Sequence, residues 1–368
     1  DLVYIVEDDK ELNIKAPEHP KLVSIKDIED ITIVSKEPID IGLKVINDNN
    51  SVVSYGNMKL MLNEQIAQNY INGNVAYKHL PIDDFAIKEL TQEDKNILYF
   101  DNKDIKKDFD EGFLVWDEGS LCYKKDEEIF RGVFGIVAGV EHILSDAFYT
   151  MKEAIDNNEK VMFILPDGLS MEQVEYYHND LELLNTGYTQ AASVHPAISN
   201  VALASIITGV SPYKNGITKR GMAPLDVDDI FSYAIEKNKV VKYIEGSSNL
   251  VQTTLQPILS APDSNGYTDK KVFDNSIEAL QDDPDLIFIH FHGIDDVNHK
   301  YSPISPQAKN KIIETEGYII ELMEDFDGKV IILPDHGAIT YYDSDNDPKG
   351  RHGYFEKDDM IVPYYIYE

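Results

Sequence analysis

Continuous apolar runs alternate with helix-like segments in the second part of the chain. The runs cover residues 161–165, 285–291 and 329–333. Runs that are apolar throughout are typical of strands covered on both faces, as in parallel sheets. Helical periodicity occupies residues 139–155, 201–207, 229–237, 273–280 and 308–325. This alternation predicts an α/β fold over residues 131–368, with a mainly parallel sheet between two layers of helices.

Residues 1–130 have a different pattern, with short apolar runs separated by polar turns. Residues 31–35 form a β-branched run, which predicts a strand. Residues 42–46 and 51–54 flank a turn-rich segment and predict a hairpin. Residues 58–71 have the periodicity of an amphipathic helix. We therefore expect residues 1–130 to form a small β-rich accessory domain, and no chemical motif in them indicates its role.

The charge balance narrows the classes of partner. The chain has 368 residues, enough for two domains, with 66 acidic and 33 basic side chains and a formal net charge of −33. A field of that sign repels a nucleic-acid backbone and attracts divalent cations. We therefore expect no binding to nucleic-acid duplexes, and we interpret most of the acidic side chains as a solvated surface.

The cysteine content excludes a disulfide-stabilised protein, and the length of the apolar stretches excludes a transmembrane helix. The single cysteine, Cys122, rules out a disulfide framework and a thiolate cluster, so a metal would need oxygen and imidazole ligands. The most apolar stretch, residues 133–140, is far shorter than the ~20 residues of a transmembrane helix. The sequence begins at Asp1, which is compatible with export or surface anchoring after removal of a leader, and equally with a cytoplasmic protein.

Acidic and histidine motifs follow each of the three apolar runs. Their residues are Asp167, Asp295 with His299 four positions later, and Asp335 with His336. In open α/β sheets, binding sites form at the carboxyl ends of the strands. One such motif would more often be a turn than a ligand set. Three such motifs, each directly after an apolar run, predict a site in which carboxylates and imidazoles converge.

Ser199 lies at the start of the apolar helix predicted over residues 201–207. A serine at this position is most often an N-cap. The same helix start also stabilises anions such as phosphate, because its N–H groups are unpaired. A serine nucleophile needs a base or a metal to promote its ionisation. Arg351-His352-Gly353 adds another imidazole in a turn near the C-terminus.

The ordered set of motifs resembles the alkaline phosphatase superfamily, in particular the type I phosphodiesterase and nucleotide pyrophosphatase branch. The phosphoethanolamine transferases are similar as well. Residues 195–217 (HPAISNVALASIITGVSPYKNGI) resemble the nucleophile segment, and residues 290–303 (HFHGIDDVNHKYSP) resemble the strand with Asp-x-x-x-His. Residues 350–353 and 360–366 resemble the ending of that branch. The resemblance extends from about residue 155 to the C-terminus and leaves residues 1–130 unexplained.

The resemblance implies a three-layer fold and a site with two divalent metal ions, most often zinc, with manganese as an alternative. One ion would be held by Asp295, His299 and His352. The other would be held by Asp167, Asp335 and His336, with Ser199 between the two ions. Ser199 would attack a small-molecule or lipid-headgroup phosphoester to give a phosphoseryl intermediate, which water then hydrolyses. This predicts hydrolysis of phosphodiesters or phosphomonoesters.

Departures from the family pattern leave alternatives open. Ala202 occupies a position where many nucleotide pyrophosphatases have asparagine, so a nucleotide substrate is not implied. Candidate substrate contacts are Asn200, Lys219 and Arg220. A phosphoethanolamine-type transferase shares the first half-reaction, and a non-catalytic surface binding protein could retain the fold. His290 and His292 share one strand face, and we expect at least one of them to pack or support rather than bind a metal.

Overall fold

The computed structural model describes residues 140–368, except 222–223, 325 and 355, and the strands of residues 1–139. The chain divides into two compact units. One contains residues 1–140 and 355–357, and the other contains residues 141–354 and 358–368.

The described part of the first unit consists of strands in three sheets. Their orders are β2-β1-β3-β5, β10-β9-β8-β6 and β4-β11-β7. The strands are β1 (Leu2–Glu7), β2 (Lys10–Lys15), β3 (Ile31–Ser35), β4 (Val45–Asn47), β5 (Asn57–Leu60), β6 (Ala86–Leu90), β7 (Ile97–Phe100), β8 (Gly112–Asp117), β9 (Ser120–Lys125), β10 (Glu128–Arg131) and β11 (Val133–Ala138).

Two sequence expectations for this unit change in the structure. The helix predicted over residues 58–71 is wrong at its start, because β5 pairs there in an antiparallel ladder with β3. Pairing with a β-branched neighbour outweighs helical periodicity in such a short segment. Of the predicted hairpin, β4 pairs in parallel with β11, while residues 51–54 lie outside the described residues. The strand predicted at residues 31–35 is β3.

The second unit is built around an eight-stranded sheet of order β12-β14-β21-β18-β13-β17-β15-β16. Its strands are β12 (His142–Ile143), β13 (Val161–Pro166), β14 (Tyr188–Ala192), β15 (Val241–Glu245), β16 (Ile258–Leu259), β17 (Leu286–Phe291), β18 (Lys329–Ile332) and β21 (Ile361–Tyr367). β21 runs antiparallel to both β14 and β18, and the other pairs are parallel. The sheet is therefore mixed and mostly parallel.

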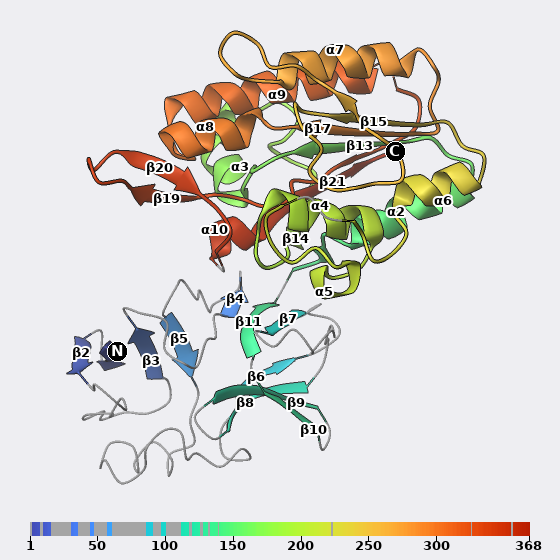
Figure 1. The fold of residues 1–368 in the computed structure, drawn as a ribbon. Helices are drawn as coiled ribbons and strands as arrows, with labels where there is room; N and C mark the ends of the chain where they lie inside the picture. Colours follow the sequence, from blue (N-terminus) through green and yellow to red (C-terminus); the bar gives the residue numbers. More distant parts are fainter. Residues whose placement is uncertain are drawn as a thin grey trace. The chain divides into compact units, whose positions relative to one another are not determined.

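Helices cover both faces of this sheet (Figure 1). The helices are α2 (Asp146–Asp156), α3 (Met171–Tyr177), α4 (Ser199–Thr208), α5 (Pro212–Asn215), α6 (Ile230–Glu236), α7 (Asp269–Leu280), α8 (Gly293–Tyr301), α9 (Pro306–Glu324) and α10 (Lys357–Met360). In Figure 1, α7, α8 and α9 lie on one side of the sheet, and α2, α4 and α6 lie on the other. The three-layer α/β fold expected from the sequence is confirmed.

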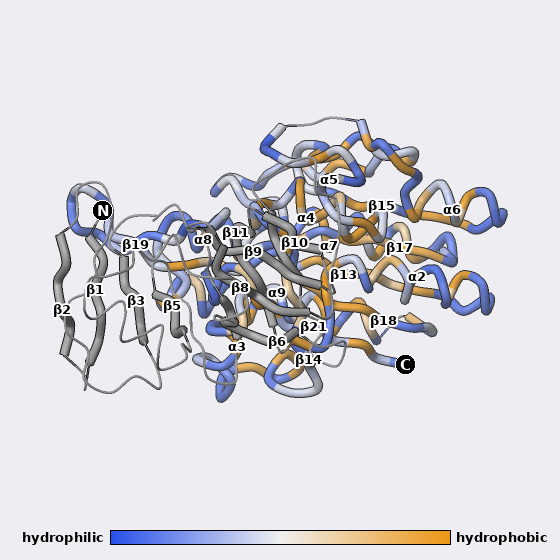
Figure 2. The backbone as a smooth tube through the Cα atoms, turned by 90° about the horizontal axis from the view of Figure 1, so that it is seen from below, coloured by the Kyte–Doolittle hydropathy of each residue, from blue (hydrophilic) through white to orange (hydrophobic). Residues whose placement is uncertain are grey.

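Side chains alternate between the two faces of the sheet along its central strands, and each face packs against one layer of helices. Phe163 and Leu165 of β13 pack in one apolar cluster with α2, α4 and α6. Met162 and Ile164 point the other way, into a second cluster with α3, α7 and α9. Every residue of β13 and of β17 is buried, as expected for strands covered on both faces. Figure 2 shows these apolar segments in orange, with hydrophilic turns between them.

Element boundaries differ modestly from those read in the sequence. The apolar runs form β13, β17 and β18. The helix expected over residues 139–155 begins only at Asp146 as α2, because His142 and Ile143 pair with β14. Within the described residues, no helix is long and apolar enough to cross a membrane.

Candidate metal centre

The carboxyl ends of three adjacent strands, β17, β13 and β18, bring the predicted site residues together. Asp167 directly follows β13 and Asp335 follows β18, and both side chains are buried. Asp295 lies in the first turn of α8, the helix that follows β17. Because these strands are parallel, their carboxyl ends meet at one edge of the sheet, where the side chains converge.

Gly168 makes the close approach of these strand ends possible. Its φ is +76°, in the left-handed region that favours glycine. Its N–H donates to Asp335 Oδ1 at 3.2 Å. A Cβ at this position would lie 2.9 Å from the Cβ of Asp295. The Asp-Gly pair thus places two carboxylates within reach of each other and leaves no room for a larger residue.

We expect Gly168→Ala to destabilise the chain and to disturb the site. The left-handed backbone and the contact with Asp295 together cost about 1–3 kcal/mol. Thermal unfolding would measure the loss. Gly266→Ala is the matched control, because Gly266 also has a positive φ, +90°, but nothing lies within 4 Å of its added Cβ. Equal effects of both changes on divalent-ion affinity would contradict the role of close packing at Gly168.

One group of side chains combines Asp295 with two histidines. His299 lies one turn after Asp295 on α8, and its Nε2 is 3.3 Å from Asp295 Oδ2. His352 follows β20 (Pro348–Arg351), which pairs with β19 (Ile339–Tyr342), and its Nε2 is 4.0 Å from Asp295 Oδ1. One ligand atom from each of the three residues lies within 4.8 Å of the others.

A second group lies around His336. Its Nε2 is 3.4 Å from Asp167 Oδ1 and 3.4 Å from Asp335 Oδ2. The Ser199 hydroxyl is 3.2 Å from the same nitrogen. The rings of His336 and His352 stack with centroids 3.9 Å apart, so the two groups are adjacent. All seven residues predicted as ligands or nucleophile therefore lie in one place.

Backbone carbonyls orient the three histidines. Nδ1 of His299 lies 3.0 Å from the Gly350 carbonyl oxygen, Nδ1 of His336 lies 2.8 Å from that of Gly337, and Nδ1 of His352 lies 2.8 Å from that of Ala197. Because a carbonyl only accepts, each Nδ1 carries the proton. In the neutral form of each imidazole, Nε2 therefore has the lone pair, and this atom faces the carboxylates. This is the arrangement that metal-binding histidines adopt.

Three buried carboxylate oxygens face the same space without a hydrogen-bond donor among the described residues. They are Asp167 Oδ1, Asp295 Oδ1 and Asp335 Oδ2. Lone pairs on oxygen and nitrogen facing each other in a buried site are costly unless a cation lies between them. The separation from Nε2 to oxygen is 3.3 Å between His299 and Asp295 and 3.4 Å between His336 and Asp167. These separations match roughly the spacing of neighbouring ligands on a tetrahedral ion with bonds of ~2.0–2.1 Å. The residues therefore fit a divalent cation.

The pKa shifts of three site residues agree with this fit. Burial and the charge of Asp167 raise the pKa of Asp335 well above its ordinary value. Burial lowers the pKa of His352, with His336 acting in the same direction, so this imidazole stays neutral, as a ligand must. The hydrogen bond to Asp295 raises the pKa of His299 to about 9, so a cation there would displace a proton.

Ser199 is the first residue of α4, and Ile198 is the N-cap. Among the residues that the structure describes, no side-chain hydrogen bond caps this helix. The N-cap interpretation of Ser199 is therefore wrong, because its hydroxyl donates to His336 Nε2 instead of to the helix backbone. The residue stands at the positive end of a ten-residue helix, beside the carboxylates and imidazoles.

The three candidate substrate contacts have different surroundings. The Asn200 amide nitrogen donates to the backbone carbonyls of Lys219 and Gly221, at 2.8 and 3.0 Å. Asn200 thus fixes the loop that follows α5. On that loop, Arg220 Nη2 donates to His352 Nε2 at 3.2 Å, which places a guanidinium at the edge of the site. The contact described for Lys219 is through its carbonyl oxygen alone.

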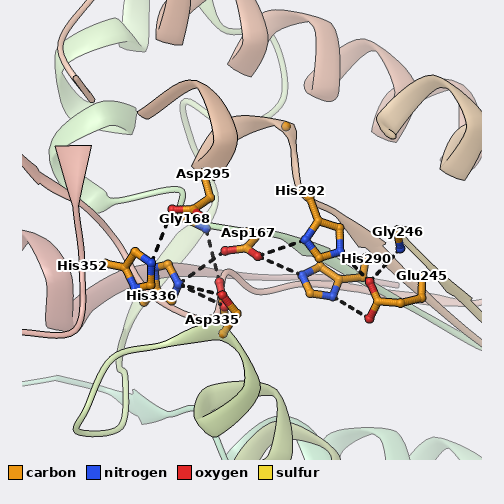
Figure 3. A network of polar contacts seen from close by, with 12 residues as sticks. Asp167, Gly168, Glu245, Gly246, His290, His292, Asp295, Asp335, His336 and His352 are labelled. Atoms are coloured by element: carbon orange, nitrogen blue, oxygen red, sulfur yellow. Dashed lines mark hydrogen bonds and ion pairs between the residues drawn. The ribbon is translucent and has the colours of Figure 1, made fainter. Parts of the chain in front are cut away.

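A further set of buried polar residues lies behind Asp167. Figure 3 shows Asp167 between the ligand groups on one side and His290, His292 and Glu245 on the other. His290 Nε2 lies 3.3 Å and His292 Nδ1 lies 3.4 Å from Asp167 Oδ2, and a supporting place for at least one of these histidines stays a prediction. Glu245, at the end of β15, had no sequence signal, because its place depends on β15 lying beside β17. Burial raises the pKa of Asp167, but hydrogen bonds from His290 and His292 hold it well below its ordinary value.

Comparison with known proteins bears out the family resemblance. A model of the type I phosphodiesterase / nucleotide pyrophosphatase family matches residues 248–348. This segment includes Asp295, His299, Asp335 and His336, while Asp167, Ser199 and His352 lie outside it. GPI ethanolamine phosphate transferase 3 of Schizosaccharomyces pombe is 24% identical over 278 residues, which cover 67% of this chain. The matched part spans 28% of that relative's length.

Similar solved structures include hydrolases of two kinds. Phosphonoacetate hydrolase of Sinorhizobium meliloti 1021, in complex with phosphonoformate, matches with a TM-score of 0.42 and 16% identity, over 52% of this chain and 59% of that chain. Human ectonucleotide pyrophosphatase / phosphodiesterase 5 matches with a TM-score of 0.43 and 14% identity, over 57% of this chain and 88% of that chain.

Proposed function

We propose that this chain, which resembles the type I phosphodiesterase and nucleotide pyrophosphatase family over residues 248–348, cleaves phosphoesters with Ser199 as nucleophile on a site for two divalent cations. The proposal rests on carboxylate oxygens that have no hydrogen-bond partner among the described residues and that converge with imidazole Nε2 atoms beside Ser199. Asp295, His299 and His352 would hold one ion. Asp167, Asp335 and His336 would hold the other.

Different groups of the site have separate roles in an in-line displacement at phosphorus. Ser199 Oγ forms a bond to phosphorus while the bond to the leaving oxygen breaks. The N-terminus of α4 stabilises the negative phosphoryl oxygens, because its first N–H groups lack helical partners. Bound cations would promote ionisation of the serine and stabilise the leaving oxygen. Attack by water on the phosphoserine then regenerates Ser199. Zinc suits the mixed nitrogen and oxygen ligands, and manganese is the alternative.

Transfer to an alcohol is the second candidate, supported by the similarity to an ethanolamine phosphate transferase. It shares the attack by Ser199 and differs in what then reacts with the phosphoserine. An aryl phosphodiester turned over in the presence and absence of ethanolamine or glycerol would distinguish the two. Release of the phosphomonoester alone supports hydrolysis, whereas a new diester that incorporates the alcohol supports transfer.

Phosphodiesters should be better substrates than phosphomonoesters. A monoester carries a second negative charge. Among the described residues, only Arg220 is seen to place a positively charged side chain within hydrogen-bond distance of a proposed metal ligand, His352. The chain as a whole has a net charge of −33, which penalises a dianion further. Paired aryl diester and monoester substrates with the same leaving group would test this through kcat/KM. A clear preference for the monoester would contradict it.

Arg220 is the proposed contact for the phosphoryl oxygens of the substrate. A hydrogen bond to a charged group contributes about 1.5–3 kcal/mol, so Arg220→Gln should lower kcat/KM roughly 10- to 100-fold. Lys219→Gln is the matched control, since the contact of Lys219 with Asn200 is made by its backbone. Equal losses in the two variants would indicate a general charge effect rather than a contact made by Arg220.

A further inference from the structure

Glu245 is a fully buried carboxylate at the carboxyl end of β15. Its Oε2 accepts a hydrogen bond of 2.7 Å from the Tyr243 hydroxyl, and its Oε1 accepts one of 2.7 Å from the Gly246 backbone N–H. These contacts fix the orientation of the carboxylate. The proposed chemistry does not use Glu245, yet a buried carboxylate is costly unless it is paired.

Two imidazoles complete its pairing. His290 Nδ1 lies 3.0 Å from Glu245 Oε2, and His292 Nε2 lies 2.5 Å from Oε1. The two rings stack with centroids 3.9 Å apart and an angle of 29° between their planes. One carboxylate therefore holds both rings, each by a separate oxygen.

The opposite edges of the rings meet a single atom, Asp167 Oδ2. His290 Nε2 is 3.3 Å from it and His292 Nδ1 is 3.4 Å from it. The carboxylate of Asp167 is thereby held by one oxygen. Its other oxygen, Oδ1, faces His336 and has no hydrogen-bond donor among the described residues.

The hydrogen-bond partners of Asp167, His290 and His292 show whether the two histidines orient Asp167 or form a further ion site with it. Asp167, His290 and His292 are close enough to hold a cation. However, every buried side-chain nitrogen and oxygen of Glu245, His290 and His292 has a hydrogen-bond partner among the described residues. The same holds for Asp167 Oδ2. Three oxygens without partners in the described residues, Asp167 Oδ1, Asp295 Oδ1 and Asp335 Oδ2, belong to the two proposed ligand groups. The geometry thus leaves a cation to Oδ1 and a supporting role to the two rings.

We infer that Glu245 is a positioning residue which, through His290 and His292, turns Asp167 so that only Oδ1 is offered to a cation. This inference rests on the proposed two-ion site and adds a prediction about one of its ions. Groups that orient a metal ligand typically change metal affinity by about 10- to 100-fold when they are removed. The ion held by Asp167, Asp335 and His336 should be affected, and the ion held by Asp295, His299 and His352 should not.

Zinc titration of the full chain, followed by calorimetry, tests this with Glu245→Gln. The amide keeps one acceptor oxygen but presents N–H groups to the other imidazole, so the support of Asp167 is lost on one side. We expect wild type to bind two ions and the variant to bind one of them roughly 10- to 100-fold more weakly, with the other unchanged. Asp295→Asn should weaken binding of the ion held by Asp295, His299 and His352. Combined with Glu245→Gln, it shows whether the two substitutions affect different ions.

Glu316→Gln is the matched control. Glu316 is also buried, and its Oε1 accepts from the backbone N–H groups of Glu182, Leu183 and Leu184, away from the strand ends. If Glu245→Gln does not fold, His292→Gln tests the same support, because His292 is part-buried and His290 remains. It should weaken the same ion.

Five results would overturn the inference. Unchanged affinity for both ions in Glu245→Gln would do so, as would equal weakening of both ions. Equal losses in Glu245→Gln and Glu316→Gln would indicate a general effect of removing a buried carboxylate. Three ions in wild type and two in His292→Gln would show that the rings bind a metal themselves. A wild-type chain that binds no zinc would contradict the two-ion site, and the role of Glu245 with it.

Discussion

Ser199→Ala should lower turnover of a phosphodiester by roughly 10³-fold or more, because the proposed mechanism forms its covalent bond to phosphorus through the Ser199 hydroxyl. The fold should persist. The hydroxyl does not cap α4 and makes one described hydrogen bond, to His336. Its loss should cost about 0.5–1.5 kcal/mol of unfolding free energy. Steady-state kinetics and thermal unfolding measure the two effects separately.

Ser205→Ala provides the control for this substitution. Ser205 is fully buried in the same helix, and its Oγ lies 3.3 Å from the Asn215 amide nitrogen, away from the site. The same chemical change there should leave turnover near the wild-type value. If Ser199→Ala retained a large fraction of the activity, or lost no more than Ser205→Ala, Ser199 would not be the nucleophile.

Removal of divalent ions should abolish turnover and lower the melting temperature. Three buried carboxylate oxygens of the site lack donors among the described residues, so a bound cation would stabilise the folded state specifically. At a zinc concentration of 100 times Kd, linkage gives about 2.7 kcal/mol of stabilisation. For a unit of this size, that corresponds to roughly 5–10 °C in Tm. Dialysis against a chelator and readdition of zinc or manganese, followed by calorimetry and kinetics, would measure both effects.

Ser199→Ala also separates binding from chemistry in this experiment. It keeps every carboxylate and imidazole of the site, so zinc should still raise its Tm while turnover stays absent. Asp295→Asn removes a charged ligand and should reduce the rise in Tm. A chelated wild-type chain that kept both its turnover and its Tm would contradict the metal dependence.

The sequence predicted those parts of the fold that rest on local patterns. Strands β13, β17 and β18 are buried on both faces, and that burial demands uninterrupted apolar runs, so they could be recognised. Asp167, Asp295 and Asp335 follow such runs directly, so their meeting at one edge of the sheet followed from parallel pairing. The histidines and Ser199 were assigned through the order of motifs.

Features that depend on pairing between distant segments could not be predicted in this way. β15 has no continuous apolar run, and its place beside β17 alone brings Glu245 to His290 and His292. The contacts of Asn200 with the loop at Lys219 likewise depend on tertiary folding. The start of the helix predicted over residues 58–71 was wrong because its local periodicity competes with a neighbouring strand.

The position of β21 inside the sheet has a consequence for biosynthesis. This strand is the last of the sheet to be synthesised, yet it separates β14 from β18, to which it pairs on either side. Until the ribosome has released residues 361–367, both neighbours expose unpaired backbone edges, which are prone to associate with other chains. A translation pause before residues 361–367 have left the ribosome should therefore increase the demand for chaperones, whereas a pause after their release should not.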